Sequence, residues 1–283
     1  MLSPRVFVVT GSNKGIGKSI VKLLLQDKEE KIVYLTSRNI ELGLKAVEEL
    51  AALNLHAEYH QLDITDQNSI NSLGDHLLSK HGGLDVLVNN AAIAYKEGSN
   101  VPFSERAEVT INSNFFGTIQ ICDALFPILK PNARVVHVSS TASDYAFNKL
   151  FDDRKQQFKN SDLTINGLKE LLLLFVEHAK NDTVVENGWP KFAYGMSKIG
   201  VSILTQLQQR EFDKNPELNM IVNSCCPGLV NTDMTGGNYD NMLTPDEGAD
   251  TPTYLALLPV GDNSMPKGCF YKLRKPVPFP PFS

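Results

Sequence analysis

A glycine-rich turn, placed between a strand pattern and a helix pattern, constrains this chain more than any other feature. Residues 5–10 (RVFVVT) are apolar and β-branched, and residues 15–26 (GIGKSIVKLLLQ) carry apolar side chains at helical spacing. Gly11, Gly15 and Gly17 lie at this junction. Glycine permits a tight turn, close approach of the backbone to a ligand, and close packing of helix on strand. The pattern predicts a dinucleotide site with the pyrophosphate at the helix N-terminus; the alternative is a glycine turn without a ligand.

The rest of the chain alternates strand and helix patterns in the same way. Strands that are apolar on both faces, each followed by a helix, are typical of a doubly wound parallel α/β sheet. We therefore predict a single Rossmann-type domain over residues 1–283, with a sheet of about seven strands and a helical insertion at about 141–190. The Pro-rich end, 275–283, is expected to be extended or loose. The expected strands are 5–10, 31–37, 57–63, 84–91, 133–140, 220–228 and 268–273, and the expected helices are 15–26, 40–53, 66–80, 103–129 and 193–212.

Composition argues against several classes of function. The 283 residues carry a net charge of −5, which gives no reason to expect a nucleic-acid or anionic-membrane partner. The longest purely apolar run, LLLLFV at 171–176, is far short of a membrane span, and the N-terminus lacks a signal-peptide pattern. The four cysteines show neither metal-ligand spacing nor a C-x-x-C motif, so we expect no metal and a reduced, cytoplasmic protein.

The end of the second expected strand bears on the choice of nucleotide. Proteins that bind NAD usually place an acid there to accept from the ribose 2′-hydroxyl, but this chain has Ser37 and then Arg38. Arg38 can hold a 2′-phosphate by charge-assisted hydrogen bonds, and Lys14 in the glycine turn can add a second positive charge. These residues predict NADP(H) as the cofactor; the alternative is two solvated surface cations. Asp63, which ends the third strand, is expected to meet the adenine or to cap the helix from residue 66.

Several short motifs stand along the chain in the order of a known family. They are TGSNKGIG at 10–17, NNAA at 89–92, NFFGT at 114–118, HVSS at 137–140, YGMSK at 194–198 and PGLVNT at 227–232. From about residue 5 to 272 the sequence resembles the short-chain dehydrogenases/reductases, and segments such as HQLDI, GGLDVLVNNA and CCPG are most similar to the NADPH-dependent carbonyl reductases. One departure is Ala92, where the family usually has glycine.

Tyr194 and Lys198 lie four residues apart, so a phenol and an ammonium share one face of a helix. Alone, this spacing is common, and its alternative meaning is two half-exposed helix residues. A nearby cation favours the phenolate and lowers the tyrosine pKa from its usual value of about 10. The resemblance implies that Tyr194 protonates a carbonyl oxygen as hydride reaches the carbon, and that Lys198 also binds the nicotinamide ribose.

The resemblance implies two further catalytic residues. Ser140, the second serine of HVSS, is expected to donate a hydrogen bond to the same carbonyl oxygen, with Ser139 as its rival. Asn114, a poor helix former in the middle of a helix, is expected to open a local kink and to hold a water that relays a proton to the lysine. The alternative for Asn114 is a polar core residue with a hydrogen-bonded side chain.

Other motif positions imply contacts with NADP(H). Asn90 is expected to touch the adenine ribose through its backbone. Thr232 is expected to bond the nicotinamide carboxamide, or else to cap a helix that starts near Asp233. The full expected cofactor set is Thr10, Gly11, Asn13, Lys14, Gly15, Ile16, Gly17, Arg38, Asp63, Ile64, Asn90, Ala91, Tyr194, Lys198, Pro227, Gly228, Val230 and Thr232.

The substrate is expected to lie at the ends of the fourth, fifth and sixth strands, in an apolar slot with one exposed cation. Lys96 can attract a carboxylate, and carbonyl reductases of this type also take glutathione conjugates. For Trp189 the alternative is an anchor for the following helix, and for Cys226 a small buried apolar residue. The expected substrate set is Ser140, Ile93, Tyr95, Lys96, Trp189, Cys226, Leu229 and Met234.

We therefore predict an enzyme that reduces small-molecule carbonyl compounds (quinones, aromatic ketones and aldehydes) to alcohols with NADPH. One alternative is a reductase dedicated to a single steroid, terpenoid or alkaloid ketone, since such relatives share the long insertion. A second is a binding protein that senses NADP without catalysis. The joint presence of Asn114, Ser140, Tyr194 and Lys198 disfavours this second alternative.

The insertion also bears on the oligomeric state. Residues 163–180 contain Leu168, Leu171, Leu172 and Phe175 at helical spacing, and Asp162 or Thr164 can cap the helix that they predict. In oligomeric relatives the helices that carry the asparagine and the tyrosine pack against a second subunit. We expect the insertion to cover that surface and to leave the protein monomeric. The alternatives are a mobile flap over the substrate and a surface for a different partner.

Overall fold

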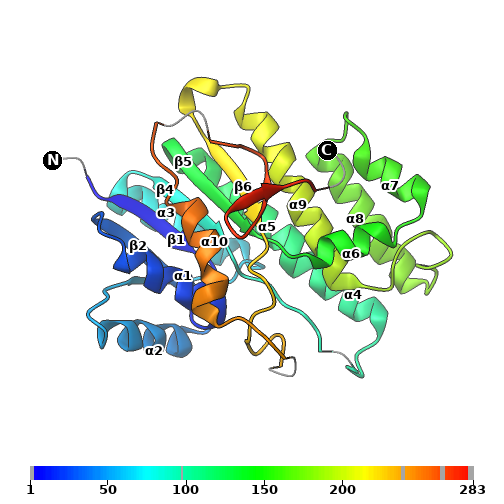
Figure 1. Cartoon of the computed structure of the whole chain (residues 1–283), viewed down its shortest axis with the longest axis horizontal. Coiled ribbons are helices and arrows are strands. Elements are labelled where there is room, and N and C mark those ends of the chain that lie inside the picture. Colours follow the sequence, from blue (N-terminus) through cyan, green and yellow to red (C-terminus); the bar gives the residue numbers. More distant parts are fainter. Residues whose placement is uncertain (1–2, 97, 237–239, 262–264, 280–283) are drawn as a thin grey trace.

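The computed structural model describes residues 3–96, 98–236, 240–261 and 265–279, which form an eight-stranded sheet between two layers of helices (Figure 1). The strand order across the sheet is β3-β2-β1-β4-β5-β6-β7-β8, and neighbours are parallel except β7 and β8. The predicted doubly wound parallel sheet is therefore confirmed. The strands are β1 (Arg5–Val9), β2 (Lys31–Ser37), β3 (Glu58–Gln61), β4 (Leu84–Asn89), β5 (Leu129–Val138), β6 (Ile221–Cys225), β7 (Phe270–Lys272) and β8 (Lys275–Val277).

Alternate side chains of the strands enter two separate cores. In β1, Phe7 and Val9 face one layer of helices, whereas Val6 and Val8 face the other, and all four are buried. This burial on both faces explains why the strands are continuous apolar runs in the sequence. No helix in the described residues has the length and apolar character that a membrane span needs. One layer contains α1 (Gly15–Gln26), α2 (Ile40–Ala51) and α10 (Pro245–Ala256), and the other contains α3 (Gln67–His81), α5 (Gly117–Leu125) and α9 (Ala193–Phe212).

The end of the chain is more regular than the sequence suggested. β8 pairs with β7 through a hairpin whose turn residues, Leu273 and Arg274, have positive φ values of 49° and 61°. Positive φ at both turn positions matches the twist of the flanking strands. The sheet thus has one strand more than expected. The last part of the predicted loose tail, residues 280–283, lies outside the described residues.

The helix expected at 103–129 is divided. α4 (Phe103–Ile111) runs into a π-helical turn at Asn112–Phe116, which is followed by α5. β5 then begins at Leu129, earlier than expected. A π-helical turn widens a helix locally, and such turns are frequent at functional sites. The kink that was predicted around Asn114 is therefore confirmed.

α10 was not expected from the sequence, although its start carries a recognisable signal. The side chains of Thr244 and Glu247 form a capping box, and Pro245 occupies the first turn. α10 packs along α1 and also touches the segment after β6. A Cβ added at Gly248 would lie 2.4 Å from Cγ2 of Val230, so only glycine allows this contact. α10 thereby holds the segment that was expected to reach the nicotinamide.

The insertion forms α6 (Ala142–Asn148), α7 (Asp152–Lys159) and α8 (Ile165–Lys180), all at one end of the molecule (Figure 1). Of the two expected caps, Thr164 begins α8, because its hydroxyl accepts from the Gly167 N–H at 3.1 Å. Leu172 is completely buried, whereas the neighbouring Leu173 is 52% exposed. α8 therefore has one buried stripe and one solvent face, as its spacing predicted.

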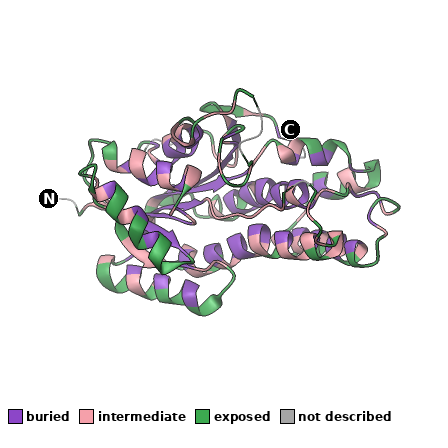
Figure 2. Ribbon diagram, turned by 90° about the horizontal axis from the view of Figure 1, so that it is seen from below, coloured by how far each residue is buried: buried purple, intermediate pink, exposed green. Residues whose placement is uncertain are grey.

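The buried stripe of α8 packs against α4 and α9. At Gly200 of α9, an added Cβ would lie 2.5 Å from Leu172 Cδ1 and 2.8 Å from the Phe115 ring. Figure 2 shows how the central helices and strands are buried while the outward faces of the surrounding helices are exposed. The insertion thus covers the two helices that were expected to lie beneath it.

A buried imidazole joins α9 to the sheet. His137 of β5 lies between Gln208 of α9, whose Oε1 is 2.8 Å from Nε2, and Asn89 of β4, whose Nδ2 is 3.2 Å from Nδ1. The amide of Asn89 donates, so Nδ1 must accept, and the ring fits this place only when neutral. Burial, together with the positive charge of nearby Lys198, lowers the pKa of His137 to about 4.

Acid should therefore destabilise the fold through His137. The unfolded imidazole titrates near 6.5, whereas the folded one stays neutral down to about pH 4. Between these values only the unfolded state gains the proton, so the free energy of unfolding falls as pH drops, by about 3 kcal/mol in total. His137→Asn should remove this part of the pH dependence in urea unfolding at about pH 7 and pH 4.5.

The matched control is His56→Asn, which removes an imidazole at an exposed position. It should keep the pH dependence of the wild type. If His137→Asn loses as much stability on acidification as the wild type does, the imidazole of His137 is not the acid-sensitive group.

Candidate active site

The candidate residues lie at the carboxyl ends of four central strands, in the segments that follow β1, β4, β5 and β6. Strand order reverses between β1 and β4. In sheets of this type, the carboxyl ends of the strands at such a switch point form the usual ligand crevice. The TGSNKGIG, NNAA, HVSS and CCPG motifs all end or follow these strands.

The glycine turn is fastened to the end of β4. The Thr10 hydroxyl accepts from the backbone N–H groups of Asn90 and Ala91, both at 3.0 Å. The side-chain amide of Asn90 donates to the carbonyls of Thr10 and Gly11 at 2.9 and 3.1 Å. Gly11 has φ of +61°, and an added Cβ would lie 2.8 Å from Ala91 Cα. Thr10 and Asn90, expected beside the cofactor, therefore also fix the shape of the turn.

The N-terminus of α1 carries no side-chain cap, and its first turn contains no acidic residue. A Cβ at Gly17 would lie 2.5 Å from the Asn90 amide, and one at Gly15 would lie 3.3 Å from Thr232. The backbone N–H groups of the first turn are thus available to an anion. The absence of a Cβ at Gly15 and Gly17 leaves these groups unobstructed. Asn13 and Ile16 lie in the same turn, half-buried.

The two cations expected at the 2′-phosphate differ in their surroundings. Arg38 is exposed at the end of β2, and no acidic side chain in the described residues pairs with it. Lys14 instead pairs with Asp233 of the segment after β6, at 2.7 Å, with both side chains largely exposed. Lys14, and to a lesser extent Lys96, holds the pKa of Asp233 below its usual value. The ion pair Lys14–Asp233 therefore links the glycine turn to the far side of the crevice.

Asp63 is not the cap of the following helix. Asp66 caps α3, and its side chain accepts from the Asn68 N–H. Asp63 accepts from the backbone N–H and the hydroxyl of Thr65 at 2.9 and 2.7 Å. Ile64 packs against Gly117 at the start of α5, where an added Cβ would lie 3.0 Å from Ile64 Cδ1. The contact of Asp63 and Ile64 with the adenine stays a prediction.

Tyr194 and Lys198 lie in the first turns of α9, and the ammonium is 5.6 Å from the centre of the phenol ring. Lys198 is 3% exposed, and its Nζ donates to the Val138 carbonyl at 2.7 Å. Burial lowers the pKa of Lys198 to about 8. Burial also raises the pKa of Tyr194 to about 12, the nearby Cys226 adds to the rise, and Ser140 offsets part of it. The expected lowering of the tyrosine pKa is therefore wrong for this structure, because desolvation dominates.

The two serines of HVSS have different surroundings. Ser139 is buried, and its hydroxyl bonds Ser202 at 2.7 Å and the Lys198 carbonyl at 3.2 Å. Ser140 is half-buried, accepts from the Ala142 N–H at 3.1 Å, and is near enough to Tyr194 to lower its pKa. This geometry favours Ser140 over Ser139 as the partner of the phenol.

Asn114 fits the alternative of a polar core residue with a hydrogen-bonded side chain, and the proton relay through water stays a prediction. Its side chain is buried, accepts from the Ile93 N–H at 2.8 Å, and donates to the Ile93 carbonyl and to Ser197. It lies within the π-helical turn, where Thr118 Oγ1 donates to the Asn114 carbonyl at 2.8 Å. Asn114 thereby fixes the loop after β4 against α9. Ala92 in that loop has no positive φ, so alanine replaces the usual glycine without backbone strain.

The segment after β6 lies near the glycine turn, since Thr232 is close to Gly15. Pro227 and Gly228, with φ of +88° at the glycine, turn the chain, and Val230 is buried against α10. Thr232 begins a turn in which its carbonyl accepts from the Thr235 and Gly236 N–H groups at 3.1 Å. The next described helix is α10, which Thr244 caps, so Thr232 does not serve as a helix cap.

The expected substrate residues are only partly brought together. Cys226 is close enough to Tyr194 to raise its pKa, and Ile93 lies beside Asn114. Leu229 and Met234 are 49% and 38% exposed on the segment after β6. Tyr95 is half-buried and Lys96 exposed, both on the loop after β4.

Trp189 is placed differently from the rest of that set. It is 2% exposed, and its indole N–H donates to His178 of α8 at 2.9 Å. Its ring packs against Phe158 and Phe175, with Arg154 above it at 4.5 Å. The structure thus places Trp189 in the core of the insertion, which fits the alternative role of an anchor.

Two aromatic residues beside Tyr194 were not expected from the sequence. Phe192 precedes it by two residues, and Tyr145 follows Ser140 on α6. Their rings form contacts with one another and, through Phe192, with the Tyr194 ring. Only the position of Phe192 next to the YGMSK motif was available as a signal.

Two surface cavities lie away from these residues. One, of about 550 Å³, lies between α1 and α10, and the other, of about 740 Å³, lies between α9 and the end of the chain. Neither is lined by a residue of the expected catalytic set.

Comparison with known proteins adds independent information. The profile of the short chain dehydrogenase family matches residues 5–151. Carbonyl reductase (NADPH) 1 of Macaca fascicularis is 45% identical over 94% of this chain and 95% of its own length. Carbonyl reductase (NADPH) 3 of Homo sapiens is 44% identical over 93% of this chain and 94% of its own length. The structure of salutaridine reductase from Papaver somniferum has a TM-score of 0.82 at 29% identity, over 94% of this chain and 99% of that one.

Proposed function

The chain belongs to the short-chain dehydrogenase family, and from this premise we propose that it is an NADPH-dependent carbonyl reductase. The observation that carries the proposal is the buried ammonium of Lys198, which lies 5.6 Å from the centre of the Tyr194 ring and is held by the Val138 carbonyl at the end of β5, two residues before Ser140. Two relatives that align over nearly their whole length are named as carbonyl reductases that use NADPH.

The residues at the crevice fit NADPH. Gly11, Gly15 and Gly17 stand where a Cβ would obstruct the turn, and the first turn of α1 presents uncapped backbone donors. These donors suit the pyrophosphate. Arg38 suits the 2′-phosphate, and Lys14 can join it because its exposed ion pair with Asp233 is readily exchanged for a phosphate partner. When bound, NADPH supplies the hydride that adds to the carbonyl carbon.

The chain's own residues then handle the proton. A pKa of about 12 keeps the Tyr194 phenol protonated at neutral pH, which is the form a proton donor needs. As negative charge develops on the carbonyl oxygen, that oxygen becomes a stronger base than a phenolate, and the proton passes to it from Tyr194. Ser140 donates a hydrogen bond to the same oxygen, and Lys198 stabilises the phenolate that remains. Asn114 holds α9 and the loop after β4 in register for this transfer, and its place in the π-helical turn suits a proton relay through water.

The substrate class we propose is quinones, aromatic ketones and aldehydes. Cys226, Leu229 and Met234 give the site apolar walls, and Lys96 provides a cation that can receive a carboxylate, including that of a glutathione conjugate. The second candidate, a reductase dedicated to a steroid, terpenoid or alkaloid ketone, is favoured by the likeness of the whole fold to salutaridine reductase. A panel of quinones, aldehydes and ketosteroids assayed by NADPH oxidation distinguishes the two.

Tyr194→Phe should reduce turnover by about 10²–10⁴-fold, because the variant keeps the ring but loses the proton donor. NADPH affinity, measured by isothermal titration, should stay close to that of the wild type. Tyr59→Phe, at a tyrosine outside the proposed catalytic set, is the matched control and should keep full turnover. Turnover of Tyr194→Phe within tenfold of the wild type would rule out Tyr194 as the general acid.

Arg38→Asp should reverse the cofactor preference. The carboxylate repels a 2′-phosphate and can accept from a 2′-hydroxyl, so the ratio of NADPH to NADH affinity should fall by at least about tenfold. Lys45→Asp makes the same charge change at an exposed position of α2 and should leave the ratio nearly unchanged. Equal ratios in Arg38→Asp and wild type would mean that the 2′-phosphate is recognised elsewhere.

We also propose a cytoplasmic monomer. Four free thiols suit a reducing compartment, and α8 occupies the surface of α4 and α9 that oligomeric relatives use for a second subunit. Sedimentation equilibrium at micromolar concentration should give one species near the chain mass of 31.3 kDa. A stable dimer or tetramer would contradict the proposed role of the insertion and would leave the catalytic proposal standing.

A further inference from the structure

Three aromatic rings form a continuous row that begins at Tyr194. The centre of the Phe192 ring lies 6.4 Å from that of Tyr194, and the centre of the Tyr145 ring lies 6.0 Å from that of Phe192. The rings of Tyr145 and Phe192 meet edge to face, at 78°. These spacings fall within the range in which aromatic pairs attract one another. The row thus leads outward from the phenol that donates the proton.

The middle ring of the row is held in place by a glycine. A Cβ added at Gly195 would lie 2.5 Å from Cδ1 of Phe192 and 2.6 Å from the methyl group of Ala146. Phe192 therefore lies across the first turn of α9 and against α6, where no larger residue at position 195 could coexist with it. The position of this ring is set by backbone packing rather than by a flexible loop.

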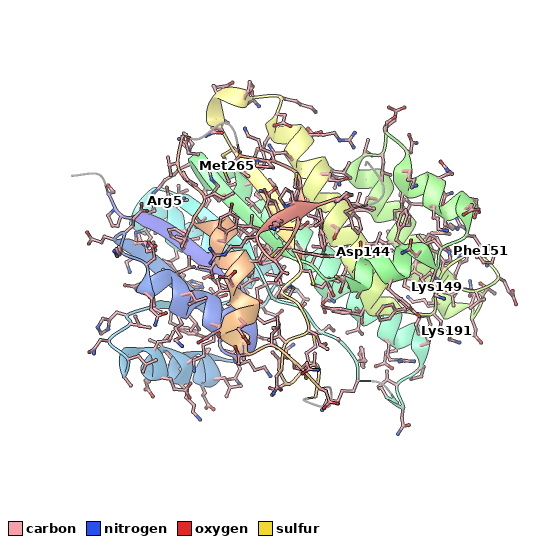
Figure 3. The ribbon with its side chains drawn as sticks, viewed as in Figure 1. Arg5, Asp144, Lys149, Phe151, Lys191 and Met265 are labelled. Atoms are coloured by element: carbon pink, nitrogen blue, oxygen red, sulfur yellow. The ribbon has the colours of Figure 1, made fainter. Side chains whose placement is uncertain are left out.

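The outer ring is fixed less tightly but remains accessible. Tyr145 is 59% exposed, and the ammonium of Lys149 lies over its ring at 5.7 Å from the centre. α6 is anchored at Asp144, which pairs with Lys272 of β7 at 2.9 Å. Asp144, in α6, and Lys149, directly after it, are labelled in Figure 3. Tyr145 thus presents an exposed aromatic ring at the outer end of the row.

From this arrangement we propose that Tyr145 and Phe192 form an aromatic wall that selects flat aromatic carbonyl substrates over saturated ones of the same size. The inference rests on the proposed reductase function and names the residues that determine its specificity. Phe192 lies between Tyr194 and Tyr145 in the row, so a flat ring that stacks on the wall is held close to the Tyr194 phenol. A puckered saturated ring cannot make the same close contact with the wall.

The test compares 1-indanone, a flat aromatic ketone, with its saturated analogue octahydroinden-1-one. Binding of each ketone to the NADP⁺-saturated protein is measured by isothermal titration, and its reduction is measured separately by NADPH oxidation. Tyr145→Ala and Phe192→Ala should each weaken binding of 1-indanone by about two- to tenfold, and binding of the saturated ketone by less than twofold. Tyr145→Phe keeps the ring and should bind 1-indanone like the wild type.

Phe151→Ala is the matched control, because Phe151 is 55% exposed on the same insertion but takes no part in the row. It should leave both affinities unchanged. Gly195→Ala should act like Phe192→Ala, since a methyl group at 195 displaces the ring. Tyr145 lies at the surface, so its variants remain informative even if a change at 192 or 195 impairs folding.

Two results would overturn the inference. One is unchanged affinity for 1-indanone in Tyr145→Ala and Phe192→Ala, and the other is an equal loss of affinity for both ketones. A wild-type protein that binds 1-indanone but reduces no carbonyl compound would instead overturn the proposed function. In that case the binding data still decide whether the wall exists.

Discussion

The burial of α9 is the constraint on which the rest of the site depends. This helix is enclosed by the sheet on one side and by the insertion on the other, and even its polar residues Ser197, Ser202 and Gln208 are buried. Buried polar groups need partners, and most of these come from β5 and the residue after it: Val138 accepts from Lys198, Ser139 bonds Ser202, and His137 bonds Gln208, whereas Ser197 accepts from Asn114. The same bonds that satisfy the helix fix the distance between Lys198, Tyr194 and the end of β5.

The sequence predicted the features that local pattern determines. The glycine turn, the spacing of Tyr194 and Lys198, and the cap of α8 at Thr164 each need only a few neighbouring residues, and the structure contains them. α10 could have been predicted in the same way, because its capping box involves only Thr244 and Glu247, three residues apart. The parallel sheet followed from apolar runs alone, since such runs need burial on both faces.

Features that depend on tertiary contacts could not be predicted from local sequence patterns. The partner of Lys14 is Asp233, which is remote in the sequence, and nothing around either residue indicates the other. Tyr145 and Phe192 meet only because α6 lies against the first turn of α9. The pKa of Tyr194 depends on how much water reaches the phenol, so the presence of a lysine one turn away did not determine even its direction. Ion-pair partners, ring contacts and pKa values of this kind depend on the packed structure and cannot be read from the sequence.

The hairpin of β7 and β8 has a consequence for the chain outside catalysis. An open sheet ends in a row of unpaired backbone groups that can recruit a strand from another molecule and start aggregation. Here the last strand is short, runs against its neighbour, and contains Pro276, which has no N–H to offer a further strand. The opposite edge, β3, is also short and carries Glu58, which is paired with Lys80. Both ends of the sheet are thus built to stop its growth, which protects a crowded solution of this protein from edge-to-edge association.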